Sequence, residues 1–305
     1  MRVAVVGAAL WTCASAVVAA HGGELAHQPT AGALSSWDLA AVAVLVLAGG
    51  FYAAGLRRLA QREAVPPRLE RAAFFCGWVS LLIAVLPPLD GLSTLRFSAH
   101  MLQHELMMLV GAPLVIAGRP LPVWLWGLPS TWRMPAGEVF RRSGVGDVWY
   151  VVTTPLVAWA LHGLAVWLWH IPTLYDAAVA NEGVHAFQHA IFVGTSSLFW
   201  WGLLYGRYGR AGYGAAVFYV FTTVIHTGLL GAILTFAGRP FYPIYLGPAQ
   251  AGGIDPVADQ QIAGLLMWIP AGIILTLLGL GFFAAWIGAA ARRQHELHPT
   301  PTENL

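Results

Sequence analysis

Residues 261–288 read QIAGLLMWIPAGIILTLLGLGFFAAWIG, an apolar run without Asp, Glu, Lys or Arg. A helix needs about twenty apolar residues to cross the hydrocarbon core of a bilayer, so this run predicts a membrane helix. The whole chain shares the bias, because 58% of its 305 residues are hydrophobic and 10% are charged. Globular chains are about a quarter charged. The sequence therefore predicts an integral membrane protein, and its net charge of +2 gives no indication of a nucleic-acid partner.

Similar apolar runs precede this one along the chain, at residues 37–58, 71–89, 97–118, 149–171, 183–205 and 214–237. Together they predict an all-α fold, a polytopic transmembrane helical bundle of about seven spans occupying residues 37–290. Residues 119–148 are expected to form a cytoplasmic loop with a short interfacial segment. Residues 238–260, rich in Gly and Pro, are expected to form a structured outer loop.

The amino terminus resembles a secretory signal peptide over residues 1–20. Arg2 is followed by an apolar stretch and by the small residues Val18-Ala19-Ala20, which fit a cleavage site. An uncleaved first helix is the alternative. Residues 21–36 are then an extracytoplasmic tail, and residues 291–305 a cytoplasmic tail.

The arginines predict how the bundle is oriented. They concentrate in alternate connections, at Arg57, Arg58, Arg62, Arg68, Arg71, Arg119, Arg133, Arg141, Arg142, Arg207, Arg210, Arg292 and Arg293. Loops rich in Lys and Arg remain in the cytoplasm. The amino terminus is therefore expected outside and the carboxyl terminus in the cytoplasm, in a bacterial plasma membrane. Cleavage of a signal peptide predicts the same side for the amino terminus.

Histidines gather at the outer ends of three predicted spans. His100 and His104 open the third span, His170 closes the fourth, and His185 and His189 open the fifth. Both pairs have a spacing of four residues, which places two imidazoles on one helix face. Imidazole suits copper, zinc and haem iron. These five histidines are the expected ligand pool, with Asp259 at the start of the seventh span as a hydrogen-bond acceptor or an occasional ligand.

Other polar and sulfur-containing residues follow the same stripes. His100, Gln103, His104, Met107 and Gly111 have helical spacing, so a thioether is expected on the histidine face. Gln103 and Gln188 are expected to orient the imidazoles. His162 and His226 lie deeper in their spans and are candidates for a relay or a second metal site. The alternative for each is a hydrogen bond to a neighbouring helix.

The two cysteines, Cys13 and Cys76, form no Cys-x-x-Cys pattern, which argues against a thiolate metal cage or covalent haem. Cys76 lies inside an apolar run and is expected to be buried.

An ordered series of segments covers most of residues 95–290. It comprises His100-Met101-Leu102-Gln103-His104 with Met107, Met108 and Pro113, Leu168-Trp169-His170-Ile171-Pro172 with Tyr175-Asp176, His185–His189 with Phe199-Trp200-Trp201, Leu230–Phe236 with Arg239-Pro240 and Tyr242-Pro243, and Asp259-Gln260-Gln261 with Gly264, Met267-Trp268 and Pro270. The series resembles the CtaG family of membrane-embedded haem–copper (caa-type) cytochrome c oxidase assembly factors. Glu105 departs from that pattern, where an apolar residue is expected.

The resemblance implies an assembly factor, not an enzyme, that supplies copper during oxidase maturation. Its expected partners are a copper-carrying cytochrome c oxidase subunit, an extracytoplasmic copper donor and membrane lipid. Two alternatives remain open on the residues alone. One is a membrane cytochrome that holds haem between two histidines, and the other is a copper permease with His162 and His226 at its midplane.

Overall fold

The computed structural model describes residues 35–206 and 212–297. All regular elements within these residues are helical, in agreement with the predicted all-α fold. The predicted signal peptide at 1–20, the tail up to residue 34 and the last residues from 298 lie outside the described part of the chain.

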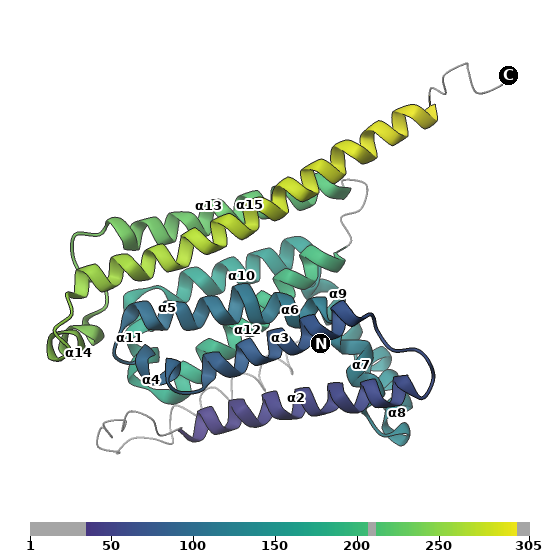
Figure 1. Ribbon diagram of the computed structural model, residues 1–305, viewed down its shortest axis with the longest axis horizontal. Coiled ribbons are helices and arrows are strands. Elements are labelled where there is room, and N and C mark those ends of the chain that lie inside the picture. The colour runs from purple at the N-terminus through teal and green to yellow at the C-terminus, as the bar shows by residue number, and fades with distance from the viewer. Residues whose placement is uncertain (1–34, 207–211, 298–305) are drawn as a thin grey trace, which may run out of the picture. The chain divides into compact units, whose positions relative to one another are not determined.

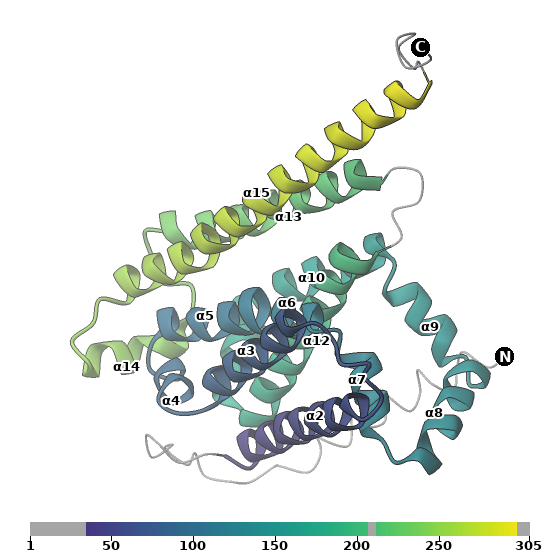
Figure 2. The same ribbon diagram turned by 45° about the vertical axis from the view of Figure 1, so that its right-hand side comes forward.

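Each predicted span contains a helix. Five of them coincide with single helices, which are α2 (Ser36–Ala60), α3 (Arg68–Val85), α12 (Glu182–Tyr205), α13 (Gly212–Phe236) and α15 (Pro256–Leu297). Helix α15 continues to Leu297, past the predicted boundary at residue 290. Figures 1 and 2 both show α13 and α15 running side by side.

The third predicted span changes its winding halfway. It begins as α5 (Phe97–Glu105), continues as a π-helix, η1 (Leu106–Gly111), and ends as α6 (Ala112–Ala117). The Ala112 amide bonds to the Met107 carbonyl, five residues back. Such π segments occur mostly as single turns inside α-helices and are frequent at functional sites.

The fourth predicted span is bent. The structure divides it into α9 (Val145–Val152) and α10 (Pro155–Trp169), which meet at an angle of 75°. Pro155 explains the break, because the residue before a proline avoids the helical conformation. Thr154 accordingly has an extended backbone, with ψ at 137°.

The prediction of a loop at 119–148 is wrong. This segment forms α7 (Pro120–Gly127), α8 (Ser130–Arg142) and the start of α9. Pro120 lies at the first position of α7, where its missing amide proton costs no hydrogen bond. Pro120 and Pro129 therefore lie at helix starts, whereas Pro135 lies inside α8. Helix α7 packs along α2.

Short elements connect the long helices at one end of the structure. These are α4 (Leu89–Ser93), α11 (Pro172–Ala180), η3 (Pro243–Tyr245) and α14 (Leu246–Ala251). Figure 1 shows α4, α11 and α14 at this common end. The outer loop predicted at 238–260 thus contains two short helical turns and the beginning of α15.

Four of the helical segments are long and apolar enough to cross a membrane, namely 36–60, 97–117, 212–236 and 256–290, and the bent pair α9–α10 gives up to five. Helices α3 and α12 fall outside this set. Helix α3 begins with Arg68, Glu70 and Arg71, and α12 carries the polar residues of the candidate site. The seven-span topology and its orientation stay predictions.

The exposed surface of the helices is apolar, as lipid contact requires. Only 6% of the most apolar window of α15 is buried. Cys76 on α3 is exposed, so the prediction that it is buried is wrong.

Close packing of α13 on α15 depends on two glycines. A Cβ on Gly231 would lie 2.6 Å from the Trp268 Cβ, and one on Gly264 would lie 2.7 Å from the Thr235 amide nitrogen. Small residues of this kind let membrane helices approach closely.

Candidate metal centre

Four of the predicted histidines form one compact group, which we call the histidine cluster (His100, His104, His185 and His189). Within each helix the ring centroids are 4.4 Å apart for His100 and His104 and 4.1 Å apart for His185 and His189. Between the helices the His100–His185 and His104–His189 centroids are 5.0 and 5.3 Å apart. Helices α5 and α12 therefore face each other through their imidazoles.

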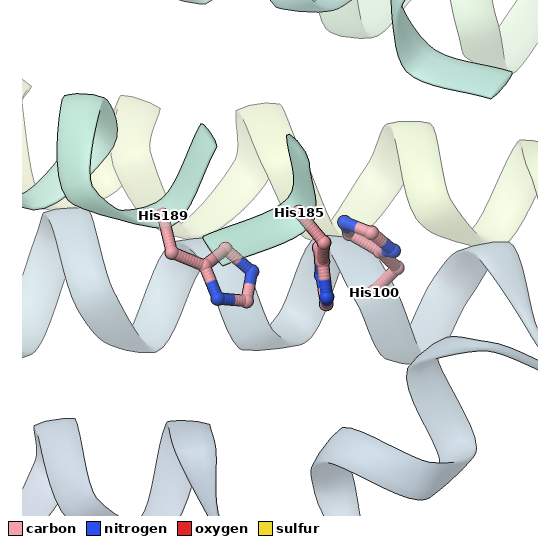
Figure 3. Close-up of side chains that lie close together, drawn as sticks. All are labelled: His100, His185 and His189. Atoms are coloured by element: carbon pink, nitrogen blue, oxygen red, sulfur yellow. The ribbon is translucent and has the colours of Figure 1, made fainter. Parts of the chain in front are cut away.

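Three members of the cluster present nitrogens to a common point. His100, His185 and His189 each offer one ring nitrogen, and these three atoms lie within 4.8 Å of one another. Figure 3 shows His185 and His189 on one helix and His100 on the facing helix, with the three rings side by side. Metal–imidazole distances are about 2.0–2.1 Å. Two nitrogens on one ion are therefore at most about 4.2 Å apart, so the three rings would have to move closer together to bind the same ion.

Tyr245 determines which nitrogen of His100 carries the proton. The Tyr245 hydroxyl donates to the Ser93 carbonyl at 2.9 Å, so its oxygen must accept from His100 Nδ1, 3.0 Å away. Burial raises the pKa of Tyr245 above its usual value, which keeps the phenol protonated. His100 is therefore protonated on Nδ1 and presents the lone pair of Nε2 to the cluster.

His104 competes with a metal for that lone pair. His104 Nε2 lies 3.0 Å from His100 Nε2 and, in this tautomer arrangement, is the donor. An ion bound at His100 Nε2 would replace this hydrogen bond. His104 Nδ1 is buried and has no hydrogen-bond partner among the described residues.

His170 lies beside the cluster and outside the group of three nitrogens. Its Nδ1 donates to the Val166 carbonyl at 2.7 Å, so its Nε2 carries the lone pair, buried and without a hydrogen-bond partner among the described residues. The His170 ring is 6.2 Å from Tyr175 and 6.5 Å from Phe192. The same two aromatic rings also contact His100 and His104.

Asp259 holds the helix that carries His100. Its carboxylate accepts from the Phe97 amide at 2.8 Å, from the Ser98 amide at 3.3 Å and from the Ser98 hydroxyl. A carboxylate at this position satisfies the free amides at the first turn of α5 and is favoured by the helix dipole. Asp259 thus positions the cluster by fixing the start of α5 against α15.

Gln103 does not hydrogen-bond to an imidazole as expected. Gln103 donates to the Ala84 carbonyl at 2.7 Å and to Asp90 at 2.9 Å. Burial raises the pKa of the Asp90 carboxyl to about 6, and the Gln103 hydrogen bond opposes that rise. Gln188 is fully buried, and its amide interacts with the His100 side chain that it was expected to orient.

The two deeper histidines lie apart from the cluster. His162 Nδ1 is 3.4 Å from the Thr195 hydroxyl, and the His162 side chain lines a cavity of about 40 Å³. The His226 ring lies 5.8 Å from Trp159, and both of its nitrogens are buried without a hydrogen-bond partner among the described residues.

The contacts of Tyr175 and Tyr245 with His100 were not predicted, although Tyr175 belongs to the series of segments that resembles the family. Tyr175 and Tyr245 belong to α11 and η3, and their hydroxyls are 3.4 Å apart. Tyr242 donates to the His170 carbonyl at 3.0 Å. The only signal for this contact in the sequence is the aromatic content of the outer loop, which does not indicate the residue each ring reaches.

The fold and the site define a helical membrane protein with a buried group of imidazoles between facing helices. The chain belongs to the family of cytochrome c oxidase caa3 assembly factors (Caa3_CtaG), which matches residues 50–289. The predicted family resemblance is thereby confirmed.

Two mycobacterial proteins are also similar to the chain. It is 25% identical over 261 residues to uncharacterized proteins of Mycobacterium bovis and Mycobacterium tuberculosis. The match covers 81% of this chain and 39% of each relative, so the chain spans less than half the length of the relatives. No solved structure matches the chain.

Proposed function

We propose that this protein supplies copper to a cytochrome c oxidase during assembly and holds the ion at the histidine cluster. The observation that supports this most directly is the approach of three imidazole nitrogens from two helices to within 4.8 Å of one another. Membership of an oxidase assembly family supplies the biological setting. Imidazole is a suitable ligand for copper.

The chemistry of the cluster fits temporary binding. Its ligands are neutral imidazoles, so they do not cancel the charge of a bound ion in a buried place, where an uncompensated charge is unfavourable. His104 also offers a proton to the lone pair on His100 that the ion would use. Both features favour release of the ion to a partner over permanent retention.

The predicted topology indicates the side of the membrane from which copper would reach the histidine cluster. The amino-terminal ends of α5 and α12 and the carboxyl-terminal end of α10 carry the histidines, and the arginine distribution predicts that these ends lie outside. An extracytoplasmic donor would deliver copper there. The oxidase subunit that carries copper would receive it in the same membrane.

The test is copper binding by purified protein in detergent. We expect the wild type to bind copper and the variants His185→Ala and His189→Ala to lose most of the affinity. Phe192→Leu is the matched control, because Phe192 contacts His104 and supplies no ligand atom. Equal copper in all four proteins, or none in the wild type, would contradict the proposal. A Soret band in the purified protein would instead support the haem alternative.

The cellular test is oxidase assembly. Deletion of the gene should lower the activity of the assembled oxidase, and added copper should restore part of it. Normal oxidase activity in the deletion strain would overturn the assembly role.

A further inference from the structure

A small cavity lies deeper in the structure than the histidine cluster. Its volume is about 40 Å³, enough for a water molecule or a bare ion. The side chains with ligand atoms among its lining residues are Glu105, Met108, His162 and Met267. Imidazole and thioether groups from α10, η1 and α15 therefore border one small space.

Thr195 fixes the tautomer of His162. The Thr195 hydroxyl donates to the Ile191 carbonyl at 2.8 Å, so its oxygen accepts from His162 Nδ1 at 3.4 Å. His162 is then protonated on Nδ1, and its Nε2 carries a lone pair that is free to bind a metal. This is the same arrangement that Tyr245 imposes on His100.

The π-helix brings Met108 to this cavity. Met107 packs with Leu81, Ala84 and Val85, whereas Met108 lines the cavity. The Trp200 indole donates to the Met108 carbonyl at 2.8 Å and holds this turn in place. Met107 therefore does not present the thioether that was predicted on the histidine face, and Met108 presents its side chain to the inner cavity instead.

We propose that Met108, Met267 and His162 form a second metal site, selective for Cu(I). Thioether ligands are soft and favour Cu(I) over Cu(II) and Zn(II). The Glu105 side chain lines the same cavity and can supply charge for the bound cation if its carboxyl proton is released when the cation binds. This inference rests on the proposed copper role and adds a second ion deeper in the structure. At a rise of 1.5 Å per residue, His162 lies about 12 Å along the helix from His170.

The two sites are distinguished by stoichiometry and by ligand type. Purified protein is loaded anaerobically with Cu(I), and bound copper and copper–sulfur scattering in X-ray absorption are measured. We expect two ions in the wild type and one, with sulfur ligation, after His100→Ala, His185→Ala and His189→Ala together. Met108→Leu with Met267→Leu should reduce the wild type to one ion without sulfur ligation.

Met101→Leu is the control, because Met101 is buried on α5 and does not line the cavity. Met-to-Leu changes conserve volume and are well tolerated, so the double variant should fold. The double Leu variant also tests the site if the triple Ala variant fails to fold. The inner site would be overturned if the wild type bound copper without sulfur ligation, or if the double Leu variant bound as much copper as the wild type. Neither result would contradict the outer site. One sulfur-ligated ion, unaffected by the histidine changes, would support the inner site alone.

Discussion

The Tyr245 hydroxyl connects the outer loop to the first imidazole of the cluster, and its removal gives a sharp prediction. Tyr245→Phe leaves the Ser93 carbonyl and His100 Nδ1 without the partners they have at 2.9 and 3.0 Å. Tyr175 also loses its hydroxyl contact at 3.4 Å. Tyr245 and His100 are 4% and 1% exposed, so water cannot readily replace the lost oxygen.

The magnitudes follow from these contacts. Each buried polar group left without a partner costs about 1–3 kcal/mol, and neighbouring losses are not additive. We expect Tyr245→Phe to lower the free energy of unfolding by about 2–4 kcal/mol in total. Loss of a group that orients a metal-binding histidine lowers metal affinity by about 10–100-fold. We expect that loss for copper at the outer cluster.

Tyr242→Phe is the matched control. Tyr242 lies in the same loop and is 3% exposed, but its hydroxyl donates to the backbone carbonyl of His170 and to no imidazole nitrogen. This variant should lose about 1 kcal/mol of stability and retain wild-type copper affinity. The assay is competition for Cu(I) with a chromogenic chelator, beside thermal unfolding, with all variants carrying Met108→Leu and Met267→Leu so that only the outer cluster binds copper. Folded Tyr245→Phe protein with wild-type affinity, or an equal loss in both variants, would refute the tautomer argument.

Three further predictions concern stability, measured by thermal unfolding in detergent. Gly264→Ala should destabilise the protein by about 1–3 kcal/mol, because its Cβ would lie 2.7 Å from the Thr235 amide nitrogen. Gly272→Ala is the control on the same helix and should be neutral, because nothing lies within 4 Å of its Cβ. Equal effects of the two substitutions would contradict the packing argument. Asp259→Asn should cost about 1 kcal/mol through the weakened cap on α5, and an unchanged melting temperature would show that the charge is unimportant there. Burial raises the pKa of Asp90 from 3.8 to about 6, so the folded state prefers the protonated carboxyl, and wild-type stability relative to Asp90→Asn should fall as the pH rises from 3.8 to about 6. A constant difference across that range would show that the pKa is not raised.

The positions of the helices could be predicted from the sequence because lipid imposes a simple rule on apolar length. The bend before Pro155 and the helices between residues 120 and 152 were missed, since proline marks both the end of one helix and the start of another. Helix α12, which was predicted to be a span, is not among the helices that are apolar enough to cross a membrane. The polar residues that make this helix part of the site are the ones that lower its apolar score.

The sequence predicted which histidines share a helix face, but not which helices face each other. The four-residue spacing placed the imidazoles on helix faces, and the loop charges placed them at one level. Tertiary packing determines that α5 faces α12 and that Tyr175 and Phe192 lie between His170 and the cluster. Tyr245 lies 145 residues from His100 in the chain, and no local pattern connects them.

The π-helix at 106–111 accommodates one residue more than an α-helix would, and this affects the third predicted span. Deleting one residue there would restore regular α winding, and the helix on either side would keep its facing, because the π turn absorbs the about 100° of rotation that one extra residue adds. Met107 and Met108 lie inside this turn, so theirs are the directions that the deletion would change. A single widened turn thus lets one uninterrupted segment present nitrogen ligands in one direction and sulfur in another.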